Sequence, residues 1–284
     1  MRLRSFLLLM LLFCGGALGL LFAQKEWAQY PGQTNSPVPP DYKVPHEWVW
    51  ARLRYNGGGR FGGGGFGGGG FRGGRRGGGG GSGAWATDYS KGDRILVSGI
   101  KRLTLLDTRS VEQVVDLDGS DDIYNWPFLY AVEVGQWTLN DAEAKQLRDY
   151  IDRGGFFMVD DFHCDSQWAS FMSSFELVYG SEEVVDIPDD DAINGTVFNI
   201  NPRKQVPGAQ YVRSGRMDEC GGGSDGIPHW RGVYDKRNRL VAVMVHNSDL
   251  GDAYEYADDP GYPQEFSQTA FQLMSNYVVY DLTH

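Results

Sequence analysis

Hydrophobic positions in the middle of the chain follow two different periods, and the change of period predicts the fold class. A nearly uninterrupted apolar run over residues 126–134 predicts a strand that is buried on both faces. Residues 139–151 then place apolar side chains at helical spacing, behind a cap at Thr138 or Asn140. A second apolar run follows at residues 156–159. Strand, helix and strand with short connections are typical of parallel pairing through a right-handed crossover, so we predict an α/β domain with a mostly parallel sheet flanked by helices.

The same two periods predict the remaining elements of one domain over residues 46–284. Apolar and polar positions alternate over residues 46–55, which predicts a first strand with Trp48, Trp50 and Leu53 in the core. The other expected elements are a helix over residues 93–106, a strand over 111–117, a helix over 165–179 capped by Asp165 or Ser166, a hairpin of 230–234 with 240–245, and a helix over 265–280.

The first part of the chain has a different pattern. Arg2 and Arg4 precede a long apolar run, and residues 1–24 as a whole predict an export signal or a membrane anchor. Cleavage of this segment and its retention in the inner membrane both stay open. Residues 25–45 are rich in proline and predict an extended linker. We therefore expect an exported protein, in the periplasm or another extracytoplasmic space.

A glycine-rich stretch over residues 57–83 interrupts the predicted domain. Glycine loses more backbone entropy on folding than any other residue and has no side chain to bury, so this stretch predicts a flexible, disordered insertion. Its arginines and phenylalanines resemble segments that stack on RNA. An exported chain rarely meets RNA, and a net charge of −11 does not favour binding to phosphate backbones, so we do not expect a nucleic-acid partner.

Polar side chains follow several of the predicted strands. In an open parallel sheet, ligands bind outside the carboxyl ends of the strands, and those ends lie at a common edge. We therefore predict one binding crevice, lined by residues that follow four strands: Asn56, Gly57, Glu133, Asp160, Asp161, His163, His246, Asn247, Asp249 and Asp252.

These residue types are compatible with a metal site or with a purely structural role. Carboxylates and imidazoles are ligands for divalent cations, and Glu255 would extend the set, so metal-assisted hydrolysis is one hypothesis. No HExxH or paired CxxC motif fixes the spacing of such ligands. The alternative is that these side chains cap helices and fix loops at the strand ends.

Cys164 and Cys220 are the two cysteines that follow the N-terminal segment. Export would allow them to form a disulfide. Cys220 lies in a glycine-rich stretch that gives no indication of its position in the fold, so we interpret the two residues as unrelated thiols.

Several long sequence blocks, in the same order along the chain, resemble the bacterial domain-of-unknown-function family 4159. The blocks are WARLRYNGGG, FLYAVEVGQWTLNDAEAKQLRDYIDRGGFFMVDDFH, VDIPDDDAINGTV, WRGVYD and HNSDLGDAYEYADDP. The resemblance extends over about residues 47–284, apart from the insertion. It implies a flavodoxin-like, class I glutamine amidotransferase-like fold and no particular reaction.

The amidotransferase comparison predicts little chemistry for this chain. Relatives that hydrolyse glutamine need a cysteine at a strand-to-helix elbow, with a histidine and an acid. Here the strand end carries Asp160 and Asp161, and Cys164 lies beyond them. We therefore favour a non-catalytic module, exported or tethered to the membrane, that binds a ligand or a cell-envelope protein through the strand-end crevice. A metal-assisted or amidotransferase-like hydrolase is the alternative, and a divalent metal is the one cofactor that the residues suggest.

Overall fold

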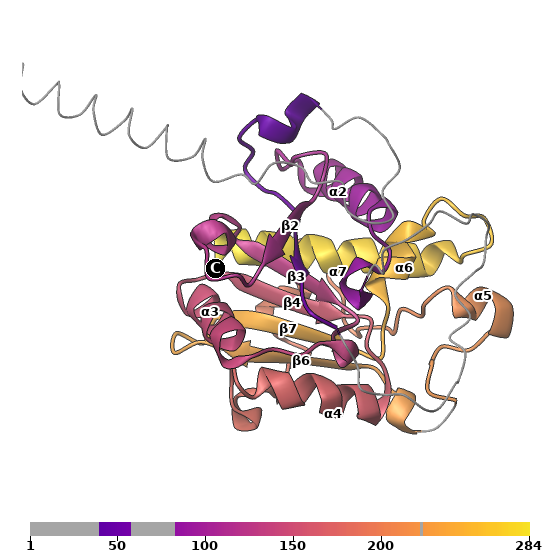
Figure 1. Ribbon diagram of the computed structural model, residues 1–284. Coiled ribbons are helices and arrows are strands. Elements are labelled where there is room, and N and C mark those ends of the chain that lie inside the picture. Colours follow the sequence, from indigo (N-terminus) through magenta and orange to yellow (C-terminus); the bar gives the residue numbers. More distant parts are fainter. Residues whose placement is uncertain (1–39, 58–82, 222–223) are drawn as a thin grey trace, which may run out of the picture.

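The computed structural model describes residues 40–57, 83–221 and 224–284, which build one seven-stranded sheet with helices on both faces (Figure 1). The strand order is β2-β1-β3-β4-β7-β6-β5. The strands are β1 (Ala51–Arg54), β2 (Gln113–Asp116), β3 (Phe128–Val132), β4 (Phe156–Asp160), β5 (Val185–Asp186), β6 (His229–Tyr234) and β7 (Leu240–His246). The predicted signal or anchor lies outside the described residues, as does the predicted insertion except for its two end glycines.

Helices of two kinds connect the strands. The α-helices are α2 (Lys91–Thr104), α3 (Asp141–Asp152), α4 (Cys164–Phe175), α5 (Gln210–Ser214), α6 (Leu250–Glu255) and α7 (Gln264–Thr283). The 3-10 helices are η1 (Pro40–Lys43), η2 (Ala84–Ala86), η3 (Asp121–Asn125), η4 (Val134–Gln136), η5 (Ser181–Glu183), η6 (Ala192–Asn194) and η7 (Ser224–Gly226). Within the described ranges, no helix combines the length and the apolar character that crossing a membrane would require.

The sheet is mostly parallel, as predicted. Strands β2, β1, β3, β4 and β7 pair in parallel, while β6 runs antiparallel to β7 and β5 antiparallel to β6. The predicted hairpin is therefore confirmed. From β1 the chain moves first to β2 on one side and then to β3 on the other, which is the flavodoxin-like order. The prediction of an α/β fold of this class is confirmed.

Alternating side chains of the central strands supply two separate cores. Phe157 and Val159 face α3 and α4, whereas Phe156 and Met158 face α2, α6 and α7. Figure 1 shows α3 and α4 on one face of the sheet and α7 on the other. Because both faces are covered, every residue of β4 is buried.

The first strand brings a buried ion pair into the second core. Trp48, Trp50 and Leu53 are at most 1% exposed, as predicted. Arg52 is equally buried and donates to both carboxylate oxygens of Asp93 on α2, at 2.9 and 2.6 Å. A bidentate pair of this kind compensates for two charges that have lost contact with water.

The helix caps show which sequence signals are local. The cap of α3 is Asn140, whose side chain accepts hydrogen bonds from the amides of Ala142 and Glu143 in a complete capping box. The cap predicted for α4 is wrong, because this helix begins at Cys164, before either predicted capping residue. The Cys164 amide instead donates to the side chain of Asn247, at the end of β7. A residue that is distant in sequence therefore replaces the local cap.

Candidate functional site

The carboxyl ends of β4 and β7 lie side by side, since these parallel strands are neighbours in the sheet. Asp160 ends β4 and is fully buried. Its carboxylate accepts a 2.5 Å hydrogen bond from the Tyr130 hydroxyl and a 2.8 Å bond from the Leu250 amide. Burial raises the pKa of Asp160 to about 6, while these two hydrogen bonds act in the opposite direction. Asp160 thus joins β4 to β3 and to the start of α6.

Asp161 has a different role, because the backbone changes direction at this residue. Its φ of 53° lies in the left-handed region, and its amide donates to the Ser248 carbonyl. The carboxylate lies 3.1 Å from Nε2 of His163. Burial, followed by the charges of Glu133 and other nearby carboxylates, raises the pKa of Asp161 well above its usual range. Glu133 at the end of β3 is therefore part of the same electrostatic environment.

The histidine at the end of β7 belongs to the packing of the α4 face. Nε2 of His246 lies 3.1 Å from the Cys164 carbonyl oxygen, and its ring lies against Phe162, Trp168 and His229. Burial lowers the pKa of His246 to about 4, so the ring is neutral near neutral pH. Its lining is aromatic, which does not resemble a set of metal ligands.

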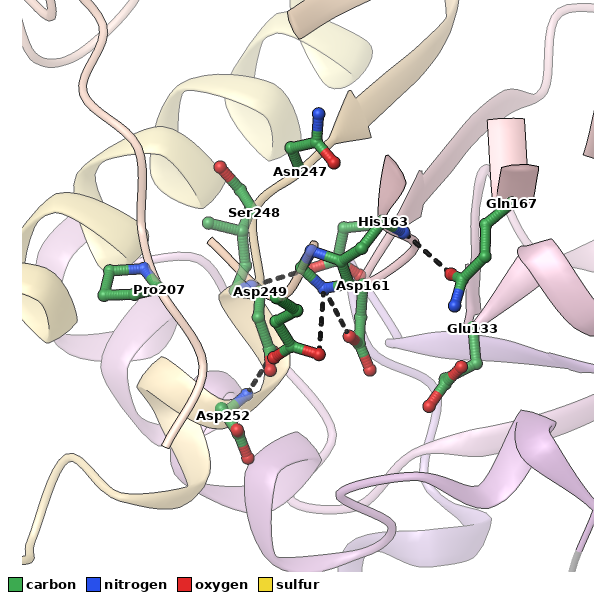
Figure 2. Close-up of polar contacts among 12 residues, drawn as sticks. Glu133, Asp161, His163, Gln167, Pro207, Asn247, Ser248, Asp249 and Asp252 are labelled. Atoms are coloured by element: carbon green, nitrogen blue, oxygen red, sulfur yellow. Dashed lines mark hydrogen bonds and ion pairs between the residues drawn. The ribbon is translucent and has the colours of Figure 1, made fainter. Parts of the chain in front are cut away.

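Asn247 is also occupied by contacts with its own chain. Besides the cap on α4, its side-chain amide donates to the carbonyls of Asp225 and Ile227 at 2.7 Å each. In Figure 2, Asn247 points away from the carboxylates of the site. Asn247 therefore holds the loop around η7 against the end of β7.

Asp249 and Asp252 begin α6. Asp249 is the N-cap and accepts a 2.8 Å hydrogen bond from the Asp252 amide, while Oδ2 of Asp252 accepts a 2.6 Å bond from the Ala209 amide. Burial and then the charge of Asp161 raise the pKa of Asp249 well above its usual range. Asp161, His163 and Asp249 turn their side chains toward one another (Figure 2).

Asp88 joins this group, although the sequence pattern did not indicate it. It lies between η2 and α2 with a φ of 58°, and its Oδ2 atom is buried without a hydrogen-bond partner. Gly251 makes room for that oxygen, because a Cβ at this glycine would lie 2.1 Å from it. Burial and the charges of Asp252 and Glu255 raise the pKa of Asp88 well above its usual range.

Asp88, Asp161 and Asp249 form the group that we call the carboxylate trio. Each contributes an oxygen that lies within 4.8 Å of an oxygen from each of the others. Asp88, Asp252 and Glu255 form a second such group around the same residue. All these donors are hard oxygen atoms, which Mg²⁺, Ca²⁺ and Mn²⁺ prefer.

Arg52 is the cation whose charge lowers the pKa of Asp88 and of Asp160. Its guanidinium is nevertheless committed elsewhere. Besides its two bonds to Asp93, it donates to the carbonyl oxygens of Trp85 and Thr87 at 3.0 Å each. Within the trio, Asp88 therefore experiences the field of Arg52 without a direct ion pair.

A disulfide adds one more carboxylate to the site. Cys164 and Cys220 are bonded, so the interpretation of two unrelated thiols is wrong. The bond holds the neighbouring Glu219 close to β4, where its Oε2 lies 3.9 Å from Nε2 of His163. Burial raises the pKa of Glu219 to about 7. Glu219 precedes Cys220 directly, so only a prediction of this disulfide would have placed it near His163.

Asn56 and Gly57 lie away from the carboxylate trio. They line a separate hollow of about 610 Å³ at the ends of β1 and β2, together with Arg54, Trp85 and Asp116. Asn56 is exposed, and its carbonyl oxygen accepts hydrogen bonds from the amide and hydroxyl of Thr138. The structure thus brings together the residues that follow β3, β4 and β7, but not those that follow β1.

No curated protein matches the sequence. The family model described as a domain of unknown function, DUF4159, matches residues 76–282. This match includes nearly all of the sheet and every member of the carboxylate trio. The chain therefore belongs to the DUF4159 family.

Proposed function

We propose that this chain is an exported, membrane-tethered binding module that holds a divalent cation in the carboxylate trio of Asp88, Asp161 and Asp249. The observation that carries this proposal is the position of the three ligand atoms, within 4.8 Å of one another, together with the buried and unpartnered Oδ2 of Asp88. Oxygen ligands at about 2.4 Å from one Ca²⁺ ion lie at most about 5 Å apart, so the trio has the right dimensions.

Electrostatics gives a reason for a cation at this position. Carboxylates that are buried close together repel one another and lose hydration, so they must either retain protons or share a positive charge. The raised pKa values of Asp88, Asp161 and Asp249 are consequences of this repulsion and loss of hydration. A divalent cation would displace the protons and relieve the repulsion, which couples its binding to pH.

The hydrogen bonds of the neighbouring residues favour binding over hydrolysis. Asp160 and His246 are engaged by their own chain, and Asp252 accepts from the Ala209 amide. A thiol mechanism at Cys164 is unavailable while this residue is bonded to Cys220. These contacts support a site that retains a ligand rather than one that activates a nucleophile.

The disulfide also supports export, because such bonds persist in oxidising compartments. Tethering rests on the apolar character of residues 1–24, which lie outside the described ranges. A cell-envelope protein that recognises the loaded module is the partner that we expect.

Calorimetry on the full-length, detergent-purified chain tests the cation site. We expect one equivalent of Ca²⁺, Mg²⁺ or Mn²⁺ to bind after chelator treatment, and we expect Asp88→Asn and Asp161→Asn to abolish binding. Asp190→Asn is the matched control, because Asp190 is an exposed loop carboxylate. Absence of binding of all three metals to the wild-type chain, or equal loss in the control, would overturn the proposal.

A further inference from the structure

The outer end of α2 combines exposed leucines with adjacent basic residues. Lys101, Arg102 and Leu103 lie in its last turn, and Leu105 follows directly. Leu103 is 43% exposed and Leu105 is 87% exposed. The chain as a whole carries a net charge of −11, so two neighbouring cations beside two exposed leucines are unusual for this surface.

Stability does not account for the leucine at position 105. Its φ of 63° lies in the left-handed region, where glycine or asparagine is less strained. As a helix C-cap in this conformation, glycine would also avoid exposing an apolar side chain. Leu105 is therefore both strained and exposed, which indicates a contact outside the domain.

The N-terminal chain enters the domain beside this end of α2. Oδ2 of Asp41 in η1 accepts hydrogen bonds from the amide and hydroxyl of Ser110, and His46 lies 3.1 Å from Asp107. Val44, between them, is 48% exposed. Figure 1 draws η1 and α2 at the same end of the molecule. Residues 1–39 precede this point, and they include the predicted membrane segment.

We propose that the α2 end surface, defined as Val44, Lys101, Arg102, Leu103 and Leu105, rests on an anionic lipid bilayer. A membrane anchor at residues 1–24 would be joined to η1 through the predicted linker, so it would keep this surface within reach of the bilayer. The basic pair complements anionic headgroups, and the apolar side chains suit the boundary between headgroups and acyl chains. Cation binding at the carboxylate trio is not required for this contact.

Two further features agree with a lipid surface. An apolar groove of about 710 Å³ between α2 and α7 begins at Arg102 and Leu103 and extends to Phe198 and Phe271. The acidic residues near this end are engaged within the domain, since Asp107 pairs with His46 and Glu47 accepts from the Asp107 amide. The exposed cations are thus the charges most available to headgroups.

Hydrogen-exchange mass spectrometry on the full-length chain tests this contact. The protein would be reconstituted into vesicles of phosphatidylcholine alone, and into vesicles of equal parts phosphatidylcholine and phosphatidylglycerol. We expect slower exchange of residues 103–110 in the anionic vesicles only. Each basic residue near an anionic surface contributes about fivefold to binding, so Lys101→Gln/Arg102→Gln should weaken the contact by roughly 30-fold and remove the difference.

Lys236→Gln/Arg237→Gln is the matched control, because it removes the same exposed pair from the turn between β6 and β7. The control should retain the protection, and Leu105→Asn should reduce it while leaving the unfolding midpoint unchanged or higher. Equal protection in both vesicle types, equal loss in the control, or protection that depends on protein concentration without vesicles would overturn the proposal. The last result would indicate a second copy of the chain on this surface.

Discussion

Asp161→Asn tests the electrostatic account of the site with little geometric disturbance. Asparagine has nearly the same shape, tolerates the left-handed backbone found at this position, and can still contact His163 through its side-chain oxygen. The substitution removes a buried ionisable carboxyl group from the carboxylate trio. We therefore expect the metal-free variant to be more stable than the metal-free wild type, although the substitution lies at a buried position.

The size of the effect follows from repulsion and from proton linkage. At an effective dielectric constant of about 20, two unit charges 4.8 Å apart repel by about 3 kcal/mol. The folded wild type avoids this cost by keeping Asp161 protonated, since burial raises its pKa well above the usual range. Unfolding releases that proton, so the wild type should lose up to about 1.4 kcal/mol relative to the variant for each pH unit.

Chemical denaturation after chelator treatment measures this difference. The stability advantage of Asp161→Asn should grow as the pH rises above the ordinary pKa of a carboxyl group, by at most about 1.4 kcal/mol for each pH unit. Adding the bound cation should reverse the order, because the wild type gains binding free energy that the variant lacks. A variant that is less stable at every pH, with no response of the wild type to divalent cations, would refute the reasoning.

Asp160→Asn is the contrasting substitution in the same strand end. Both Asp160 oxygens accept hydrogen bonds, so an amide NH₂ group would either oppose the Leu250 amide or require the Tyr130 hydroxyl, which now donates, to turn and accept. We expect a loss of about 1–3 kcal/mol, although the substitution is chemically identical to that at Asp161. Equal effects of the two substitutions would show that hydrogen bonding does not distinguish these aspartates.

Three further predictions concern the structure around the site. Arg52→Leu should cost about 3–5 kcal/mol in denaturant unfolding because it leaves Asp93 buried without its partner, and Arg52→Leu/Asp93→Leu should recover most of this loss. Cys220→Ser should cost about 4 kcal/mol, since the disulfide closes a loop with a sequence separation of 56, and a mild reductant should then no longer affect the unfolding midpoint. The metal-free wild type should lose stability as pH rises above about 7.5, where His163 and His246 are neutral in both the folded and the unfolded state and the raised carboxyl pKa values dominate; a rising stability in pH-dependent denaturation would contradict this.

Much of the fold could be predicted because its signals are local. Nearly uninterrupted apolar runs identified β3 and β4, and the helical spacing between them identified α3 with its cap at Asn140. These patterns depend on side chains a few positions apart. The parallel arrangement then followed from the short connections, and it placed Asp160 and Asp161 at the correct edge of the sheet.

The composition of the site was harder to predict. Asp88 follows no strand, and it reaches the trio because the backbone turns at this residue and Gly251 leaves space for its carboxylate. Glu219 lies near His163 because of a disulfide whose pairing the sequence did not indicate. Asn56 does follow a strand, but the hollow that it lines opens between β1 and β2.

Position at a sheet edge therefore does not by itself make a polar residue a ligand. Asp160 and Asn247 satisfy their side-chain polar atoms within the domain, Nε2 of His246 contacts the Cys164 carbonyl oxygen, and the contacts of Asn247 fix both α4 and the η7 loop. Oxygen atoms remain for a ligand only where such partners are missing, as at Oδ2 of Asp88. Those partners come from segments up to 90 positions away, as between Asp160 and Leu250, and no periodic pattern records them. Hydrogen-bond partners, rather than strand position, thus separate the residues that hold this edge together from those available to bind a cation.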